Sequence, residues 1–253
     1  MKKKLSRMEK EEILRIVGEA NALENTRYGS PLDGDRYATV PSETDPARLA
    51  AFAAVFDLGE TLDGRPVTEA MLFTDPVCRR QGIASALLAK IRKPGEVIKF
   101  AEYASPSGDA FLGNAGAVHR YDELCMTLSL PAFLKKKQES GKTDMTPAAE
   151  EETVCEEAAG VPEDASRRFF TKHSELYVNR DGDVAYLFGV RTDRAHMQKG
   201  HAKRLLSAVL WKLSAEGVRQ VVLQVSGKNV PALGLYEKTG FAVTERLGMW
   251  YLM

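Results

Sequence analysis

The sequence of 253 residues contains few of the groups that commonly bind metals or form disulfides. It has three cysteines and four histidines, and neither a CxxC pair nor an HExxH motif occurs. An odd number of widely separated cysteines does not build a disulfide framework, and these spacings do not match a zinc site. We therefore expect no metal site, and we interpret the cysteines as small apolar residues, namely Cys78, Cys125 and Cys155.

The sequence also lacks net charge and long apolar runs. Lys and Arg together number 35, as do Asp and Glu, so no broad basic surface is expected for nucleic acid or membrane. No apolar run approaches the roughly 20 residues of a membrane span. The start, MKKKLSRMEKEEILRIV, has no continuous apolar segment of the kind found in a secretory signal. We expect a cytoplasmic globular protein without a nucleic-acid or membrane partner.

Apolar periodicity predicts an α/β protein with two similar halves. Helical spacing occurs in residues 9–23, and a stretch rich in Gly, Pro and Asp at 26–46 is predicted to be a loop. In the second half, SELYVNRDGDVAYLFGV predicts a hairpin and GHAKRLLSAVLWKLSAEG an amphipathic helix. A strand, a short helix at 229–239 and a closing strand follow. A similar, less complete order in the first half indicates an old duplication.

A change of composition divides the chain. Residues 134–166 read LKKKQESGKTDMTPAAEEETVCEEAAGVPEDAS, with lysines first, then glutamates, and almost no large apolar side chain. Such a segment is typical of a solvated linker. We therefore predict a first domain at 1–133, a charged linker at 134–166, and a second domain at 167–253.

The motif QKGHA, at the start of the amphipathic helix, is a candidate phosphate site. Gly200 lets the backbone approach a ligand closely, and the exposed N–H groups at a helix N-terminus suit a pyrophosphate. Lys199 and Lys203 add positive charge. Taken alone, the motif is explained equally well as a tight turn between a strand and a helix.

Two motifs together resemble the GCN5-related N-acetyltransferase (GNAT) family. The segment RRQGIA at 79–84 is similar to the family's acetyl-CoA signature, and MQKGHA at 197–202 shares its Gly and Ala, with Met197 where Arg or Gln is expected. The segment VSGKNVPALGLYEKTGFAV resembles the family's second signature closely. The resemblance covers most of residues 171–253, and residues 65–130 less well. It implies two GNAT-like acyl-CoA N-acyltransferase domains in tandem, the first of them degenerate.

The resemblance also implies a set of functional residues. Acetyl-CoA would lie in the gap between two splayed strands, and Tyr236 would donate a proton to the leaving thiolate. The implied cofactor-binding residues are Val190, Gln198, Lys199, Gly200, His201, Ala202, Lys203, Asn229 and Tyr236. A second cradle in the first half would comprise Arg79, Gln81, Gly82 and Ala84, with Leu112 at the position of the tyrosine.

Two functions from different classes follow from these residues. The first is an enzyme whose C-terminal half moves an acetyl group from acetyl-CoA to a small-molecule or peptide amine, with no metal. Glu175 and Tyr186 are candidates for its base, although each is also explained as a surface or packing residue. The second is a catalytically inactive acetyl-CoA sensor or scaffold. Tyr236 and Asn229 favour the enzyme, and a homodimer is allowed in either case.

Overall fold

The computed structural model describes residues 1–139, 154–158 and 166–253, and these form two compact units. Unit 1 comprises residues 1–122 and 247–253, and unit 2 comprises residues 123–246. The units differ from the domains predicted from composition at residues 123–133 and 247–253, which each belong to the other unit. Among the residues described, no helix is both long and apolar enough to cross a membrane.

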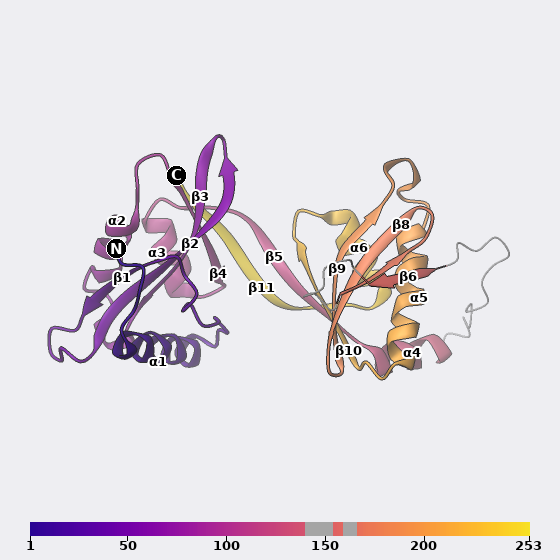
Figure 1. Cartoon of the computed structure of the whole chain (residues 1–253), viewed down its shortest axis with the longest axis horizontal. Coiled ribbons are helices and arrows are strands. Elements are labelled where there is room, and N and C mark those ends of the chain that lie inside the picture. Colours follow the sequence, from indigo (N-terminus) through magenta and orange to yellow (C-terminus); the bar gives the residue numbers. More distant parts are fainter. Residues whose placement is uncertain (140–153, 159–165) are drawn as a thin grey trace. The chain divides into compact units, whose positions relative to one another are not determined.

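Unit 1 is built on a mixed sheet with the strand order β1-β2-β3-β4-β11-β5 (Figure 1). The loop predicted for residues 26–46 is wrong in part, because β1 lies within it and pairs with β2. The elements are α1 (Arg7–Glu24), β1 (Arg36–Pro41), β2 (Leu49–Leu62), β3 (Arg65–Thr74), the 3-10 helix η1 (Pro76–Cys78), α2 (Ile83–Ile91), β4 (Val97–Tyr103), α3 (Pro106–Asn114), and parts of β5 (Val118–Ser129) and β11 (Ala242–Leu252).

Helices α1 and α2 cover opposite faces of this sheet. Successive side chains of a strand point to opposite faces. On β2, Phe52 packs in one cluster with Ile13 of α1, whereas Ala53 packs in another with Leu87 of α2. The sheet of unit 1 is therefore buried on both sides, which explains the nearly continuous apolar run LAAFAAVF in β2.

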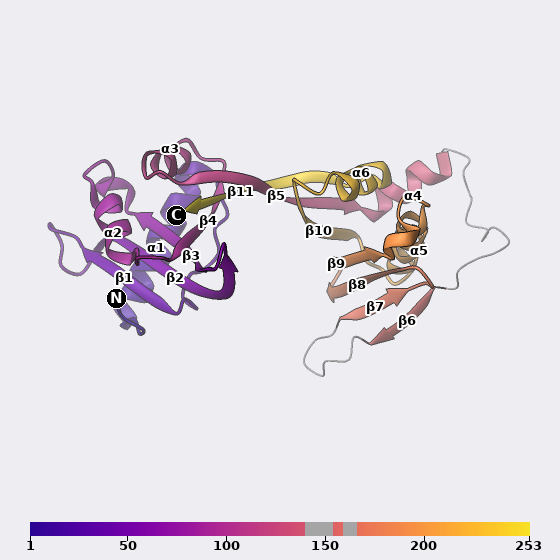
Figure 2. The same ribbon diagram turned by 90° about the horizontal axis from the view of Figure 1, so that it is seen from above.

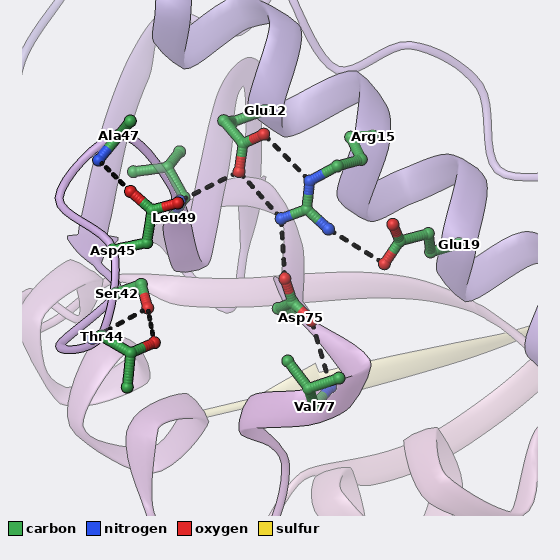
Figure 3. A network of polar contacts seen from close by, with 10 residues as sticks. All are labelled: Glu12, Arg15, Glu19, Ser42, Thr44, Asp45, Ala47, Leu49, Asp75 and Val77. Atoms are coloured by element: carbon green, nitrogen blue, oxygen red, sulfur yellow. Dashed lines mark hydrogen bonds and ion pairs between the residues drawn. The ribbon is translucent and has the colours of Figure 1, made fainter.

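A polar network joins α1 to the turn that follows β3 (Figure 3). The guanidinium of Arg15 donates to Glu12 at 2.8 and 2.9 Å, to Glu19 at 2.9 Å and to Asp75 at 2.7 Å. Asp75 in turn accepts from the backbone N–H of Val77 at 3.1 Å and caps η1. The network thereby positions the turn that leads into the RRQGIA motif.

Unit 2 contains the strands β11-β5-β10-β9-β8-β7-β6 in that order. Two elements, α4 and β6, lie at least partly in the segment predicted to be a linker, whose residues 140–153 and 159–165 fall outside those described. The elements are α4 (Leu130–Glu139), β6 (Cys155–Ala158), β7 (Arg167–Phe170), β8 (Ser174–Asp181), β9 (Val184–Thr192), η2 (Arg194–His196), α5 (His201–Ala215), β10 (Gln220–Ser226) and α6 (Val230–Thr239).

Helix α5 supplies much of the core of unit 2. Its apolar side chains recur at spacings of three and four and pack against β7, β8 and β9. Full burial of such a side chain stabilises the fold by about 1.5–3 kcal/mol. The buried residues on this face are Leu205, Leu206, Val209, Leu210 and Leu213, as the predicted amphipathic pattern requires.

The last strand in the sequence completes the sheet of the first unit. Residues Leu247–Leu252 of β11 pair antiparallel with β4, while β5 pairs antiparallel with β10 (Figure 2). Unit 1 thus contains the end of β11, which follows unit 2 in the sequence, and unit 2 contains most of β5, which follows the first part of unit 1. A division of the chain by composition cannot show this exchange.

Candidate active site

The site in unit 2 begins where two parallel strands separate. Strand β10 pairs with β9 from Gln220 opposite Val184 as far as Leu223 opposite Leu187. Beyond that pair both strands continue, to Ser226 and Thr192, without further pairing to each other. The splay expected from the resemblance is therefore present. Val190 lies on the separated part of β9 and packs partly against the core.

A turn in the left-handed backbone conformation opens helix α5. Gln198 has φ 61° and Gly200 has φ 84°, and Gly200 is the N-cap, with no side chain satisfying the first amides of the helix. The first intrahelical bond runs from Arg204 N to Gly200 O. The N–H groups of the first turn are therefore left to an outside acceptor, and the helix dipole favours an anion there.

Basic side chains surround this turn. Lys199 and Lys203 are exposed, and the small side chain of Ala202 leaves the first turn of the helix unobstructed. Arg204, which the sequence pattern did not single out, donates to Lys199 O at 3.2 Å and lies 3.1 Å from His201 Nδ1. A Cβ at Gly200 would meet Arg204 Nη1 at 3.0 Å. The residues present suit a phosphate group in charge and in backbone geometry.

The second signature forms helix α6. Asn229 is its N-cap, and its Oδ1 accepts from Ala232 N at 3.3 Å. Tyr236 is buried and packs edge-on against Phe241. Burial raises the pKa of Tyr236, so its phenol keeps its proton at neutral pH. Among the residues described, no hydrogen bond of this hydroxyl is found.

The environments of the two base candidates on the hairpin, Glu175 and Tyr186, do not favour the role of a general base. Glu175 accepts from Arg191 and, at 2.7 and 2.9 Å, from Arg168. Its hydrogen bonds with Arg191 and Arg168 lower the pKa of Glu175, which makes it a poor proton acceptor near neutral pH. Tyr186 is 47% exposed on β9. The structure assigns the base to neither.

Three histidines gather beside the α5 turn. The rings of His173 and His196 stack with centroids 3.6 Å apart, and His201 lies 5.0 Å from His173. One ligand atom from each of His173, Asp193 and His196 lies within 4.8 Å of the others, a spacing that could hold a metal ion. Basic side chains nearby, Lys199 among them, oppose a cation. The absence of a metal therefore stays a prediction.

Unit 1 repeats the backbone of this site. Arg80 has φ 62° and Gly82 has φ 77°, and Gly82 is the N-cap of α2 without a side-chain cap. Gly82 and Gly200 are the same number of residues apart in the sequence as Arg80 and Gln198. The same number of residues separates Glu69, the last residue of β3 paired with β4, from Leu187 of β9. The second cradle predicted at 79–84 thus has the same turn geometry as the first.

The second signature is only partly repeated in unit 1. Ser105 caps α3 as Asn229 caps α6, and the seventh residue after each cap is Leu112 and Tyr236 respectively. The predicted loss of the tyrosine in the first half is therefore confirmed. Glu102 and Tyr28, which the sequence did not point to, line a cavity of about 890 Å³ in this unit together with Arg79, Gly82 and Ala84.

Splayed parallel strands, a left-handed turn and an open helix N-terminus together form a site in an α/β fold that suits a phosphate-bearing ligand. Residues 145–241 match the family described as Acetyltransferase (GNAT) family. The match to the GNAT family lies on the second half of the chain. A 59-residue segment is 39% identical to the [ribosomal protein bS18]-alanine N-acetyltransferase of Haemophilus ducreyi, and covers 23% of this chain and 41% of that relative.

Solved structures share the fold over nearly the whole chain. A GCN5-related N-acetyltransferase from Sphaerobacter thermophilus superposes with a TM-score of 0.64 at 15% identity, over 95% of this chain and 91% of that one. A tandem GNAT protein from the clavulanic acid biosynthesis pathway superposes with a TM-score of 0.56 at 18% identity, over 94% of both chains. At these identities the likeness concerns the fold alone.

Proposed function

We propose that this chain is an N-acetyltransferase, and that unit 2 transfers an acetyl group from acetyl-CoA to a primary amine. The observation that carries the proposal is the turn at Gln198 and Gly200, which opens α5 after β9 has separated from β10. Such a turn presents backbone N–H groups at the C-terminal end of a parallel strand, where open α/β sheets bind ligands.

The residues of unit 2 fit the parts of this co-substrate. The N–H groups of residues 201–203 and the side chains of Lys199 and Lys203 would hold the pyrophosphate. Acetyl-CoA supplies an activated acetyl group as a thioester. Tyr236 would donate its proton to the departing sulfur, for which its raised pKa keeps it protonated. The acceptor is a small-molecule or peptide amine, and the cytoplasm is the expected setting.

Acetyl-CoA binding tests the cradle. A ligand that binds only the native state raises the melting temperature according to its concentration and Kd. Gly200→Glu puts bulk and negative charge where the phosphate belongs and should abolish the shift. Gly217→Glu is a matched control, because Gly217 lies at the other end of α5 with φ 87° and open space around its Cβ position. An acetyl-CoA shift in Gly200→Glu equal to that of the control would remove unit 2 as the binding site.

The inactive sensor or scaffold is separated from the enzyme by turnover. Both functions predict binding of acetyl-CoA at the cradle. Only the enzyme predicts release of free CoA that depends on an amine. Binding without turnover across a panel of small amines, amino sugars and peptide N-termini would favour the sensor.

A further inference from the structure

The cavity of unit 1 joins the α2 turn to a carboxyl group. Its walls include the residues of β3 and β4 beyond the last parallel pair, Glu69 opposite Lys99, and the first turn of α2. Helix α3 and the end of α1 close the other sides. The open N–H groups that follow Gly82 and the carboxylate of Glu102 therefore face one continuous space of about 890 Å³.

Glu102 is oriented within this cavity by its neighbours. Ser105 Oγ donates to Glu102 Oε1 at 3.0 Å, and the hydroxyl of Tyr28 also donates to the carboxylate. The Tyr28 hydroxyl is itself held, because it accepts from Tyr103 N at 3.0 Å. The carboxyl group thus has a defined position, and its side chain forms no ion pair among the residues that the structure describes.

The two acids that line the cavity differ in their ion pairing. Glu24 is paired with Arg79, and Glu102 forms no ion pair among the residues described. Burial raises the pKa of Glu102 to about 7, with Asp109 and Glu24 adding to the increase and the hydrogen bonds from Tyr28 and Ser105 opposing it. Burial also acts to raise the pKa of Glu24. Hydrogen bonds from Ser107 and Arg79 outweigh it, so that the pKa of Glu24 is lowered. Glu24 remains an anion, while Glu102 can exchange a proton near neutral pH.

A glycine on α3 makes room for Glu102. A Cβ at Gly108 would lie 2.1 Å from Glu102 Oε1, so any other residue would displace the carboxylate. In unit 2, counting from the N-caps Ser105 and Asn229, the equivalent positions hold Ser226 and Ala232. The short serine leaves space for the alanine Cβ. The glutamate and the glycine therefore occur together in unit 1 and are both absent from unit 2.

The two units thus carry complementary groups at equivalent places. Unit 2 has the phenol of Tyr236, and unit 1 has Leu112 there. Unit 1 has the carboxylate of Glu102, and unit 2 has Ser226. Neither substitution disturbs the turn or the strand separation, which are the same in both units. A purely structural unit would not need a carboxylate that is unpaired and faces a cavity of this size.

We propose that unit 1 is a second acyl-transfer site, in which Glu102 accepts the proton of the attacking amine; this rests on the acetyl-CoA chemistry proposed for unit 2. The carboxylate of Glu102 takes one proton from the protonated amine. The neutral nitrogen attacks the thioester carbonyl, the C–N bond forms and the C–S bond breaks. Of the two protons left on the attacking nitrogen, one passes to the leaving thiolate and the other stays on the amide product, and Glu102 returns its proton to solvent.

Binding is tested first, by isothermal titration of the full chain with acetyl-CoA. The wild type should bind at two sites. Gly200→Glu should keep the unit 1 site, and Gly82→Glu should keep the unit 2 site. Gly95→Glu is the control for unit 1, because Gly95 has φ 78° and open space at its Cβ position. Loss of all binding in Gly200→Glu, with a native melting temperature, would overturn the proposal. Loss in Gly82→Glu but not in Gly200→Glu would instead overturn the function proposed for unit 2.

Proton transfer is tested in the Gly200→Glu background with acetyl-CoA and n-butylamine, by following release of CoA thiol. The rate should rise with pH to a plateau, with a midpoint near the pKa of about 7 of Glu102. Adding Glu102→Gln should lower the rate by about 10²–10⁴-fold and remove the midpoint, while acetyl-CoA binding is retained. No thiol release in this background, or a rate unaffected by Glu102→Gln, would contradict the proposal.

Discussion

Arg15 Nη2 lies 2.7 Å from Asp75 Oδ2, and this ion pair links helix α1 to the turn that follows β3. The side chain of Asp75 is only 5% exposed and that of Arg15 19%. Removal of one partner therefore leaves a charge that water cannot solvate well. The relationship matters for the site, because the same turn leads into Arg79 and Gly82.

Arg15→Met should destabilise the protein by about 3–5 kcal/mol, the usual effect of breaking a buried ion pair. Arg7→Met on the same helix is the control, because its partner is Glu11 and the two side chains are 94% and 63% exposed. That change should alter the unfolding free energy by less than about 1 kcal/mol. Urea unfolding of the three proteins measures the difference, and equal midpoints for both variants would show that the network does not hold the turn.

The stability of the protein should fall as pH rises from about 4.5 to about 7, to the extent that Glu102 contributes. The folded pKa of this acid is raised from 4.5 to about 7, so the native state holds a proton that the unfolded state has already lost in this window. Glu102→Gln should remove that contribution. The difference in unfolding free energy, variant minus wild type, should therefore be more positive at pH 8 than at pH 4.5. Urea unfolding at the two pH values provides the test, and an identical pH dependence in both proteins would be the contrary result.

Several features of the site follow from local sequence patterns. The glycines at 82 and 200, the helices behind them, the cap at Asn229 and the leucine that replaces the tyrosine were all predictable. Each depends on residues that are neighbours along the chain. The positive φ values of Arg80 and Gln198 were not predicted, because arginine and glutamine carry no sequence signal for that conformation.

The features that could not be predicted depend on contacts between distant residues. No sequence motif marks Glu102. Its role depends on the close approach of Gly108 and on the hydrogen bond from Tyr28, which only the structure shows. In the same way, Asp193 meets His173 only because β8 and β9 pair. The strand β1 was not predicted, because its six residues lie in a segment rich in Gly, Pro and Asp. Their pairing with β2 makes them a strand.

Lys203→Ala should weaken acetyl-CoA binding in unit 2 by about two- to fivefold. An exposed ion pair between a lysine and an anion contributes roughly 0.2–1 kcal/mol. The effect should shrink at high ionic strength, because exposed charges are screened. Lys212→Ala in the last turn of the same helix is the control. Titration at low and high salt gives the comparison, and equal affinities for both variants at low salt would place the phosphates elsewhere.

The central claim is that unit 2 performs acetyl transfer with Tyr236 as the acid, and Tyr236→Phe tests it most directly. The substitution keeps the ring that packs against Phe241 and removes only the hydroxyl. In the Gly82→Glu background, which isolates unit 2, kcat should fall by about 10²–10⁴-fold. The unfolding free energy should change by less than about 1.5 kcal/mol, with Tyr177→Phe as the matched control. A full kcat together with a lower melting temperature would contradict the account, since Tyr236 would then only pack the core.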